Sequence, residues 1–580
     1  MIEFSNIKSL MLPRKNILYY LNKNTTEKKD EIAFTFLNGK ENINHTWEQI
    51  NNRSLHLASF LSKKFLKGER IILLFQNNNM FIESILACFY ADLIAVPVEP
   101  PNNHNTINKL KNIMADCLPV AIMTQLRFKK NKFFKSINNI DIVYLESIQD
   151  EKFRIIDLNP SNKVAFLQYT SGSTAEPKGV IISHENLLHN LEIIWDGTGR
   201  IINPTGVFWL PFFHDMGLVG TVFFIIFCSG RGIFFTPIKF ITDPLFYLKT
   251  ISDYKASVTV APNFAFDLIC NRYYKEKHHN FDLSNLIYVA NGSEMVSSKT
   301  LLDFYNTFKV YNFKFESWHP CYGMAECTLY ISGESQMNYE KIVYGHPYGN
   351  FNDKINIIPK ESKNSIGYVS VGFPTFDYSL ILFSDNKKNI ELGEKVIAEI
   401  CFNSNSIGNG YFNKNDISKP KKFEYVSYKG KKYFRTGDMG FIYEGNLYIT
   451  GRKKDIIIIN GKNIFCGDIE KILSKTINDE SYKNFIVTTI IKKQKELIVC
   501  IIECKKVHIE NRKNKNLYNK IISVIFEYFQ MNVFDICLVS SNSLPRTSSG
   551  KIQRFLCKNY YENGDLSLLN SLRNKDLDIK

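Results

Sequence analysis

Short apolar runs alternate with stretches of helical periodicity in the first half of this chain, and this alternation limits the possible folds more than any other feature. The run Arg70–Phe75 has the length and composition of a buried strand. Apolar residues then recur at helical spacing at Phe81, Ile82, Ile85, Leu86 and Phe89. Further strand-like runs are Ala95–Val98, Val120–Thr124, Ile142–Leu145, Val164–Tyr169, Val207–Leu210, Ser257–Ala261 and Leu286–Ala290. Strands that alternate with helices predict an α/β fold with largely parallel sheets.

The length of the chain, 580 residues, exceeds what one ordinary core organises, so at least two domains are expected. After about residue 365 the texture becomes β-rich, and after Gly451 it predicts a small α+β unit. The strands predicted there are Phe485–Ile490, Leu497–Glu503 and Ile536–Ser540. We therefore expect a large N-terminal domain, residues 1–451, built of α/β subdomains with a β-rich third subdomain. A small C-terminal domain, residues 452–580, would follow a short hinge at Gly451–Lys454.

The net charge of +15 reflects 72 basic against 57 acidic residues. Lys, Asn and Ile are enriched along the whole chain, which favours compositional bias over a nucleic-acid site. The 12 cysteines include no Cys-x-x-Cys pair, so neither a zinc site nor a disulfide framework is predicted, and a reducing compartment fits. The longest apolar run, Val222–Cys228, is too short to span a bilayer, and the N-terminus lacks a signal peptide. We expect a cytoplasmic protein.

A loop rich in glycine and hydroxyl residues, YTSGSTAEPKG, begins at the end of the run Val164–Tyr169. Glycine lets the backbone approach an anion, and successive N–H groups and hydroxyls can surround phosphate oxygens. The Gly-Lys-Ser/Thr order of a Walker A loop is absent. Alone, the loop also fits an ordinary hydroxyl-rich turn. The following GVIIS predicts a strand, and Ser183 predicts the N-cap of the next helix. The candidate phosphate-binding residues are Thr170, Ser171, Gly172, Ser173, Thr174 and Lys178.

The whole string resembles the phosphate loop of the adenylate-forming enzymes, which include acyl-CoA synthetases, luciferases, peptide-synthetase adenylation domains and fatty acyl-AMP ligases. Further segments resemble motifs of this superfamily in the superfamily's own order. Singly, each has an ordinary alternative, such as a turn aspartate or a surface lysine. The segment Asn291–Met295 departs from the common NGAEP pattern, because Ser293 stands in place of Ala and Met295 in place of Pro. The segments are Asn291–Met295, Tyr322–Glu326, Tyr433–Asp438, Gly451–Asp455 and Leu544–Lys551.

The resemblance implies that ATP and Mg²⁺ bind and assigns roles to individual residues. Glu326 and Thr170 would hold Mg²⁺, and Asp438 would bind the ribose. Lys551 would act on the carboxylate and the α-phosphate, and Lys454 would be the pivot of a mobile C-terminal domain. The remaining nucleotide-binding residues would be Asn291, Gly292, Ser293, Tyr322, Gly323, Met324, Ala325 and Arg452.

Three segments resemble the fatty acyl-AMP ligases in particular. Trp209–Leu218 is aromatic and apolar, which suits an acyl chain, and Ala95–Pro101 matches another string of these ligases. His214 would lie beside the substrate; its alternative is a structural core histidine. The spacer of residues 327–368 resembles an insertion that is thought to oppose the domain motion needed for CoA use, and its alternative is an ordinary β-rich excursion.

The resemblance implies ATP-dependent activation of a long-chain fatty acid, with transfer of the acyl group to the phosphopantetheine thiol of an acyl carrier protein in trans. Catalysis would rest on Lys551, His214 and Glu326. Carrier proteins are usually acidic, so the positive net charge would assist docking. Three alternatives stay open: an acyl-CoA synthetase, an amino-acid adenylation enzyme in which Asp215 would bind the substrate ammonium, and a non-catalytic nucleotide-binding protein.

Overall fold

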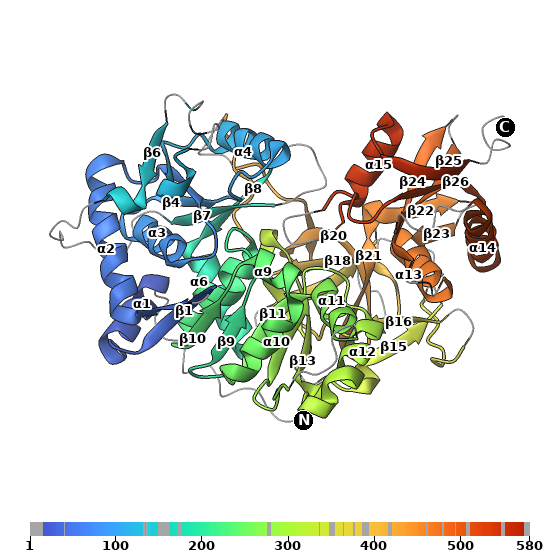
Figure 1. Cartoon of the computed structure of the whole chain (residues 1–580), viewed down its shortest axis with the longest axis horizontal. Helices are drawn as coiled ribbons and strands as arrows, with labels where there is room; N and C mark the ends of the chain where they lie inside the picture. Colours follow the sequence, from blue (N-terminus) through green and yellow to red (C-terminus); the bar gives the residue numbers. More distant parts are fainter. Residues whose placement is uncertain are drawn as a thin grey trace.

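The structure, a computed structural model, consists of two large α/β sheets, a β-rich layer and a small C-terminal unit (Figure 1). It describes residues 16–39, 41–130, 134, 137, 140–148, 163–170, 177–274, 280–335, 337–346, 354–362, 365–374, 378–384, 394–415, 420–459, 462–477, 479, 481–492, 495–505, 511–546 and 552–573.

The first sheet has six strands in the order β6-β5-β3-β4-β7-β8. All neighbours are parallel except β7 and β8, which are antiparallel. Their bounds are β3 Arg70–Leu74, β4 Ile94–Pro97, β5 Ala121–Thr124, β6 Asp141–Tyr144, β7 Val164–Tyr169 and β8 Gly179–Ser183. Ser183 caps α6 (His184–Gly197) by accepting a hydrogen bond from the Asn186 N–H at 3.0 Å. The predicted strands and this helix start are confirmed.

The second sheet has eight strands in the order β14-β13-β12-β11-β9-β10-β1-β2. Its six central strands are parallel, and β14 and β2 close the edges in antiparallel pairings. The bounds are β1 Ile32–Asn38, β2 Glu41–Thr46, β9 Thr205–Phe208, β10 Arg231–Phe234, β11 Val258–Pro262, β12 Tyr288–Gly292, β13 Trp318–Gly323 and β14 Tyr330–Gly333. The predicted α/β class with largely parallel sheets is confirmed.

Helices cover both sheets (Figure 1). A smaller apolar cluster lies between the first sheet and the helix that contains Leu110 and Ile113, and a large apolar core joins the two sheets. In this core Phe223 and Phe227 pack against aromatic rings of other elements, so the apolar run Val222–Cys228 is buried. No helix in the described part of the chain is long and apolar enough to cross a membrane. The helices are α1 Ile17–Glu27, α2 Trp47–Lys64, α3 Asn79–Tyr90, α4 His104–Cys117, α7 Asp215–Gly217, α8 Phe224–Phe227, α9 Pro237–Thr242, α10 Pro244–Asp253, α11 Asn263–Tyr273 and α12 Ser298–Phe308.

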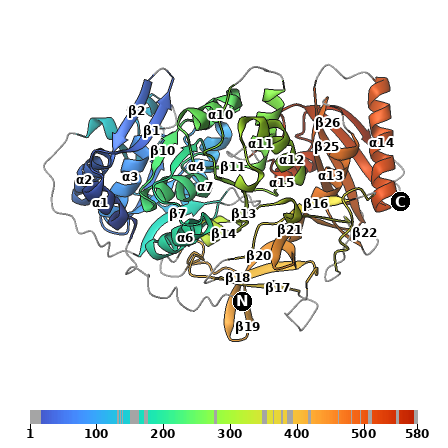
Figure 2. The ribbon, with the colours of Figure 1, turned by 90° about the horizontal axis from the view of Figure 1, so that it is seen from below.

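The β-rich layer lies beneath the two large sheets in the view of Figure 2. A five-stranded antiparallel sheet forms most of it, and β15 pairs with β16 beside it. The bounds are β15 Ile342–Gly345, β16 Ile366–Val369, β17 Ser379–Phe383, β18 Ala398–Asn403, β19 Tyr425–Tyr428, β20 Lys431–Tyr443 and β21 Asn446–Arg452. The predicted β-rich third subdomain is confirmed.

Among the described residues, the C-terminal unit has two small sheets and the helices α13, α14 and α15, which confirms its predicted α+β class (Figure 1). Strands β24, β25 and β26 contain the three predicted strands, and β25 runs parallel to β26. The bounds are β22 Ile456–Ile459, β23 Lys462–Phe465, α13 Cys466–Thr476, β24 Tyr482–Lys492, β25 Lys495–Cys504, α14 Asn511–Phe529, β26 Val533–Ser540, α15 Arg554–Asn563 and β27 Leu568–Arg573.

The connection to the C-terminal unit continues the β-rich layer for longer than the hinge motif suggests. Gly451 and Arg452 still pair with Met439 and Asp438 in the β20–β21 ladder, and a 3-10 turn follows at Lys453–Asp455. The domain boundary at residue 451 stays a prediction.

Candidate active site

The predicted site residues of the second sheet follow its parallel strands at one edge. His214 follows β9, Asn291 and Gly292 end β12, and Tyr322 ends β13. Thr170 follows β7 of the first sheet. The carboxyl ends of parallel strands meet at one edge of a sheet, and ligands of open α/β folds bind there. Topology therefore gathers residues that are far apart in sequence.

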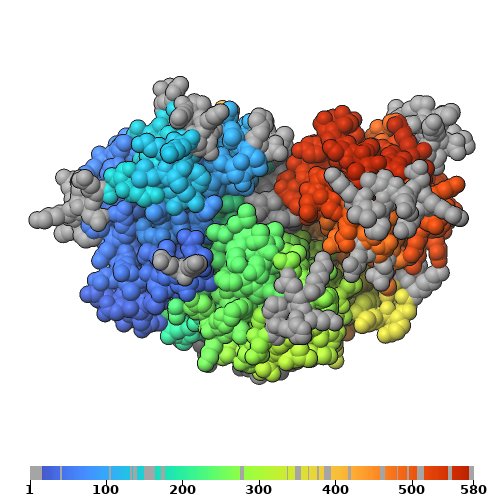
Figure 3. Space-filling view, viewed as in Figure 1, coloured from blue at the N-terminus to red at the C-terminus, as the bar shows by residue number. Residues whose placement is uncertain are grey.

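A cleft of about 3590 Å³ lies above this edge and reaches the C-terminal unit. Figure 3 shows the surface hollowed between the light-blue region of α4 and the red region of α15. The predicted site residues that line the cleft are Thr170, Lys178, His214, Ser293, Tyr322, Gly323, Met324, Ala325, Glu326, Asp438, Arg452 and Lys454. The structure thus brings together residues from five of the six predicted motifs and from the substrate segment.

Other predicted residues are placed differently. Asn291 is fully buried, and neither it nor Gly292 is among the residues that line the cleft, so both lie behind its wall. Ser171, Gly172, Ser173, Thr174 and Lys551 lie outside the described residues. Chain on either side of these gaps does line the cleft, at Thr170 and Lys178 and at Arg546 and Ile552.

Asp438 is a buried carboxylate that lines the cleft. It accepts a hydrogen bond from the Tyr322 hydroxyl at 2.8 Å, and Arg452 Nε lies 3.3 Å from its other oxygen. The Thr436 hydroxyl accepts from the Asp438 N–H at 2.9 Å and so fixes the strand around the carboxylate. Burial and the Asp438 charge raise the pKa of Tyr322 well above its usual value, so its hydroxyl remains a donor. Each oxygen of the Asp438 carboxylate therefore has a partner, and the residue still lines the cleft.

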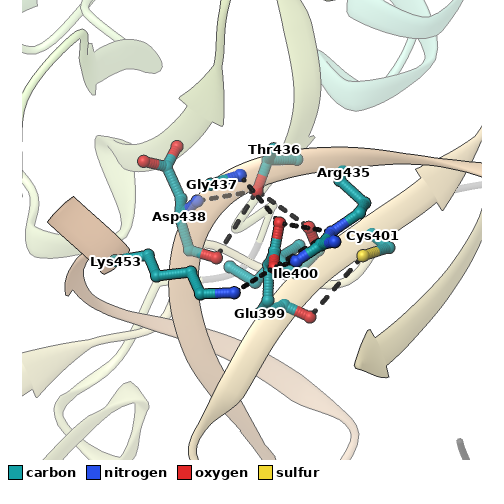
Figure 4. A network of polar contacts seen from close by, with 8 residues as sticks. All are labelled: Glu399, Ile400, Cys401, Arg435, Thr436, Gly437, Asp438 and Lys453. Atoms are coloured by element: carbon teal, nitrogen blue, oxygen red, sulfur yellow. Dashed lines mark hydrogen bonds and ion pairs between the residues drawn. The ribbon is translucent and has the colours of Figure 1, made fainter. Parts of the chain in front are cut away.

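Glu399 supports the strand that carries Asp438 (Figure 4). Its carboxylate lies 2.5 Å from the Arg435 guanidinium and 3.2 Å from Lys453 Nζ. It also accepts the Gly437 N–H at 3.3 Å. Glu399 is 3% exposed, and a buried carboxylate held by two cations and a backbone donor is costly to displace. This network fixes the backbone on both sides of Asp438.

Glu326 and Lys178 both lie beside one tyrosine, Tyr411. The Tyr411 hydroxyl donates to Glu326 Oε1 at 2.8 Å, and Lys178 Nζ lies 5.3 Å from the centre of the same ring. Burial raises the pKa of Tyr411, and the Glu326 carboxylate raises it further, so the hydroxyl stays a donor at neutral pH. Tyr411 thereby orients a carboxylate that lines the cleft beside the phosphate loop.

Three cations share the electrostatic environment of the cleft. Burial lowers the pKa of Lys454, and the positive charges of Arg452 and Lys178 lower it further against the opposing effect of Asp455 and Asp438. All three side chains line the same cleft. The positive charges of Lys178, Arg452 and Lys454 there suit a polyphosphate.

Gly323 ends β13 where no side chain fits. A Cβ there would lie 1.9 Å from the Leu329 backbone oxygen. Gly323→Ala must displace backbone at the site, so we expect a loss of about 1–3 kcal/mol in unfolding free energy. Thermal and urea denaturation measure it. Gly467→Ala on α13, where a Cβ meets nothing within 4 Å, is the matched control and should not destabilise. Equal stability of the two variants would contradict the steric account.

The side chains of His214 and Asp215 contact each other at the start of α7. Their side chains approach to 2.6 Å between Nδ1 and Oδ1, and Asp215 Oδ1 also accepts the Met216 N–H at 2.7 Å. His214 lines the cleft and is not buried, so the core-histidine alternative is wrong. The apolar side chains that line the same cleft include Ile194, Phe208, Met216, Phe224, Val258, Val260, Phe264, Ala290 and Leu329.

The described residues fit a nucleotide in charge and hydrogen bonding. Asn291 is enclosed behind the cleft wall, so the fit rests on the groups that line the cleft. Asp438 suits ribose hydroxyls, and the three cations suit phosphates. No cluster of three or more metal-ligating side chains occurs among the described residues. Mg²⁺ bound with a nucleotide needs only one or two carboxylates, because phosphates and water complete its shell. Glu326 can supply one.

Sequence reasoning missed Tyr411, Glu399 and Asn263. Tyr411 is 85 positions from Glu326, and Asn263 follows β11 and contacts Asn291 at 3.4 Å between Oδ1 and Nδ2. None of the three lies in a motif. Their contribution comes from long-range contacts that no local pattern reports.

Comparison with known proteins gives matches over nearly the whole chain. A family profile described as AMP-binding enzyme matches residues 21–412, and one described as the AMP domain of Disco-interacting protein 2-like proteins matches residues 454–571. The solved structure of a fatty acid AMP ligase from Legionella pneumophila is similar with a TM-score of 0.72 and 31% identity, covering 96% of this chain and 98% of that one.

Two curated relatives carry different acceptors in their names. The medium-chain-fatty-acid–[acyl-carrier-protein] ligase JamA of Moorena producens is 28% identical over 92% of this chain and 93% of its own. The putative fatty-acid–CoA ligase FadD21 of Mycobacterium tuberculosis is 29% identical over 94% of this chain and 98% of its own.

Proposed function

The chain belongs to the adenylate-forming AMP-binding enzymes, and from that premise we propose that it activates a fatty acid with ATP and passes the acyl group to a carrier-protein thiol. The observation that carries the proposal is the joint placement of Asp438, Glu326 and Lys178 with an apolar wall in one cleft. Nucleotide-binding groups and an acyl-binding surface then face the same space.

A fatty acid suits this cleft better than an amino acid. The apolar wall has the residue types that bury an alkyl chain, and each buried CH₂ contributes about 0.8 kcal/mol. An amino acid would require a carboxylate for its ammonium group. The candidate for that role, Asp215, already contacts His214 and the Met216 N–H. These contacts support a neutral acyl tail as the substrate's recognition element.

In the first step a carboxylate oxygen of the fatty acid forms a bond to the α-phosphorus of ATP, and the bond to pyrophosphate breaks. Both reactants are anions, so charge neutralisation and in-line placement are the main requirements. Positive charge is supplied by three side chains that line the cleft, Lys178, Arg452 and Lys454. Lys551 is proposed to contact the carboxylate and the α-phosphate. Mg²⁺, held by Glu326 and Thr170, would neutralise phosphate charge.

In the second step a thiol attacks the acyl carbon, a thioester forms, and AMP leaves with the bonding electron pair. We propose a carrier protein as the source of the thiol. The spacer of residues 327–368 supports this choice because it packs with the C-terminal unit. Its Val343 and Tyr368 share one apolar cluster with Ile469 and Ile472 of α13. Such packing opposes the rotation that would open a route for free CoA.

The acceptor test uses purified protein, ATP, Mg²⁺ and a long-chain fatty acid. Either CoA or a phosphopantetheinylated acidic carrier protein is added, and the thioester is quantified by mass spectrometry. We expect thioester on the carrier at a rate well above that with equimolar CoA, because only the carrier docks on the protein surface. The carrier with serine replaced at its phosphopantetheine site is the control.

Efficient acyl-CoA formation would overturn the carrier proposal and favour a fatty acid–CoA ligase, as the name of the FadD21 relative suggests. Adenylate formation itself would remain established by such a result, since both acceptors follow the same first step.

A further inference from the structure

The two ends of the segment that contains Lys551 are joined in the C-terminal unit. Arg546 and Ile552 form an antiparallel bridge, and the Gln553 N–H donates to the Pro545 carbonyl at 2.9 Å. Pro545, Arg546, Ile552 and Gln553 therefore form a base of defined geometry on the two sides of residues 547–551. Whatever holds this base also fixes where the segment that contains Lys551 begins and ends.

An arginine on each side of this base is held by a glutamate. On the upstream side, Arg546 Nη2 lies 2.9 Å from Glu503 Oε2, and Glu503 Oε1 accepts the Leu544 N–H at 3.1 Å. The Glu503 side chain is 1% exposed. This contact anchors Arg546 to the C-terminal end of β25, in the C-terminal sheet.

On the downstream side, Arg554 contacts two carboxylates at once. Its Nη2 lies 2.7 Å from Glu470 Oε2 on α13, and its Nη1 lies 2.8 Å from Asp455 Oδ2. Glu470 Oε1 also accepts the Val487 N–H at 2.8 Å. Asp455 ends the 3-10 turn that follows β21, one residue after the predicted pivot Lys454. Arg554 therefore joins the hinge turn to the helix that begins three residues after Lys551 in the chain.

We propose that Arg554 is a positioning residue for Lys551: its paired contacts with Asp455 and Glu470 hold the start of α15, three residues after Lys551 in the chain, against the hinge turn. This inference rests on the proposed function, because it assumes that Lys551 acts in adenylate formation. The planar guanidinium makes it possible: one fork reaches both carboxylates in set directions, which a lysine ammonium cannot do.

The partial burial of the Arg554–Glu470 pair strengthens this contact. Burial raises the pKa of the Glu470 carboxyl, while the Arg554 guanidinium lowers it and so offsets part of that effect. The Arg554 side chain is 23% exposed, so the pair is less screened than a surface pair. A catalytic group displaced by about 1 Å loses up to about a hundredfold in rate. Loss of the contact between Arg554 and the hinge turn should therefore lower the rate of adenylate formation, which uses Lys551, more than the rate of acyl transfer, which does not.

The test separates the two half-reactions in the full-length protein. Fatty-acid-dependent pyrophosphate exchange reports adenylate formation, and thioester formation from supplied acyl-adenylate reports transfer. For Arg554→Gln we expect about a tenfold fall in the kcat of adenylate formation. The KM for ATP and the transfer rate should stay near wild type. Arg554→Lys should recover only part of the loss. Lys520→Gln on exposed α14 is the control.

A second variant removes only the contact to the hinge turn. Asp455→Asn leaves the Arg554–Glu470 pair in place, so it protects the test against a folding defect in Arg554→Gln. It should lower adenylate formation in the same direction with an unchanged melting temperature. Wild-type adenylate formation in both variants, or equal loss of both half-reactions together with a lower melting temperature, would overturn the proposal. If the wild-type protein forms no adenylate, the proposed function fails instead.

Discussion

Lys551→Ala is expected to abolish adenylate formation while ATP still binds. Removing one preorganised charge from a developing transition state costs about a hundred- to thousandfold in rate. ATP binding should persist because Asp438, Arg452 and Lys178 contact the nucleotide side of the cleft independently of Lys551. Fatty-acid-dependent pyrophosphate exchange measures the rate, and calorimetric titration with ATP measures affinity.

Lys520→Ala supplies the control, since it removes the same charge from an exposed position on α14 of the same unit. Exchange by Lys551→Ala at more than about a tenth of the wild-type rate would contradict the assigned role. A parallel loss of ATP binding would instead place Lys551 in ground-state nucleotide recognition.

Asp438→Ala is expected to raise the KM for ATP by about ten- to hundredfold, because hydrogen bonds to a charged acceptor contribute about 1.5–3 kcal/mol. The substitution removes the proposed ribose acceptor and also leaves the buried Tyr322 hydroxyl and Arg452 without their partner. Initial rates over a range of ATP concentrations give KM and kcat separately.

Asp438→Asn sharpens the test, because its amide oxygen can still accept from Tyr322 while the negative charge is lost. An intermediate KM is therefore expected. Asp253→Ala, at an exposed carboxylate paired with Lys249, controls for the loss of a negative charge elsewhere. An unchanged KM for ATP in Asp438→Ala would exclude the carboxylate from nucleotide binding.

Apolar runs and capping residues predicted those strands and helix ends that depend mainly on interactions between neighbours in the sequence. Strand β7 begins and ends at the predicted residues, since VAFLQY is an apolar run long enough to be buried on both faces. The Ser183 cap was predictable because its hydroxyl satisfies an N–H of the first helical turn. The β9 and β12 strands are displaced by two residues from their predicted starts, as parallel pairing with neighbours rather than apolarity sets their ends.

The sequence motifs predicted the residues that line the site, but they did not predict the residues that hold those side chains and their backbone in place. Asp438 and Glu326 follow from recognisable strings, but Glu399 and Tyr411 hold their surroundings through contacts between strands distant in sequence. The same holds for Arg554, whose partners Glu470 and Asp455 are 84 and 99 positions away. Pairings of this kind depend on the assembled fold, which no spacing in the chain encodes.

Direct detection of the intermediate tests the central claim most simply. The wild-type protein is incubated with ATP, Mg²⁺ and either a long-chain fatty acid or a mixture of amino acids, without any thiol acceptor, and bound products are identified by mass spectrometry. Acyl-adenylate and pyrophosphate should form only with the fatty acid. Adenylate from an amino acid alone, or ATP bound unchanged with every acid, would contradict fatty acid activation in this cleft.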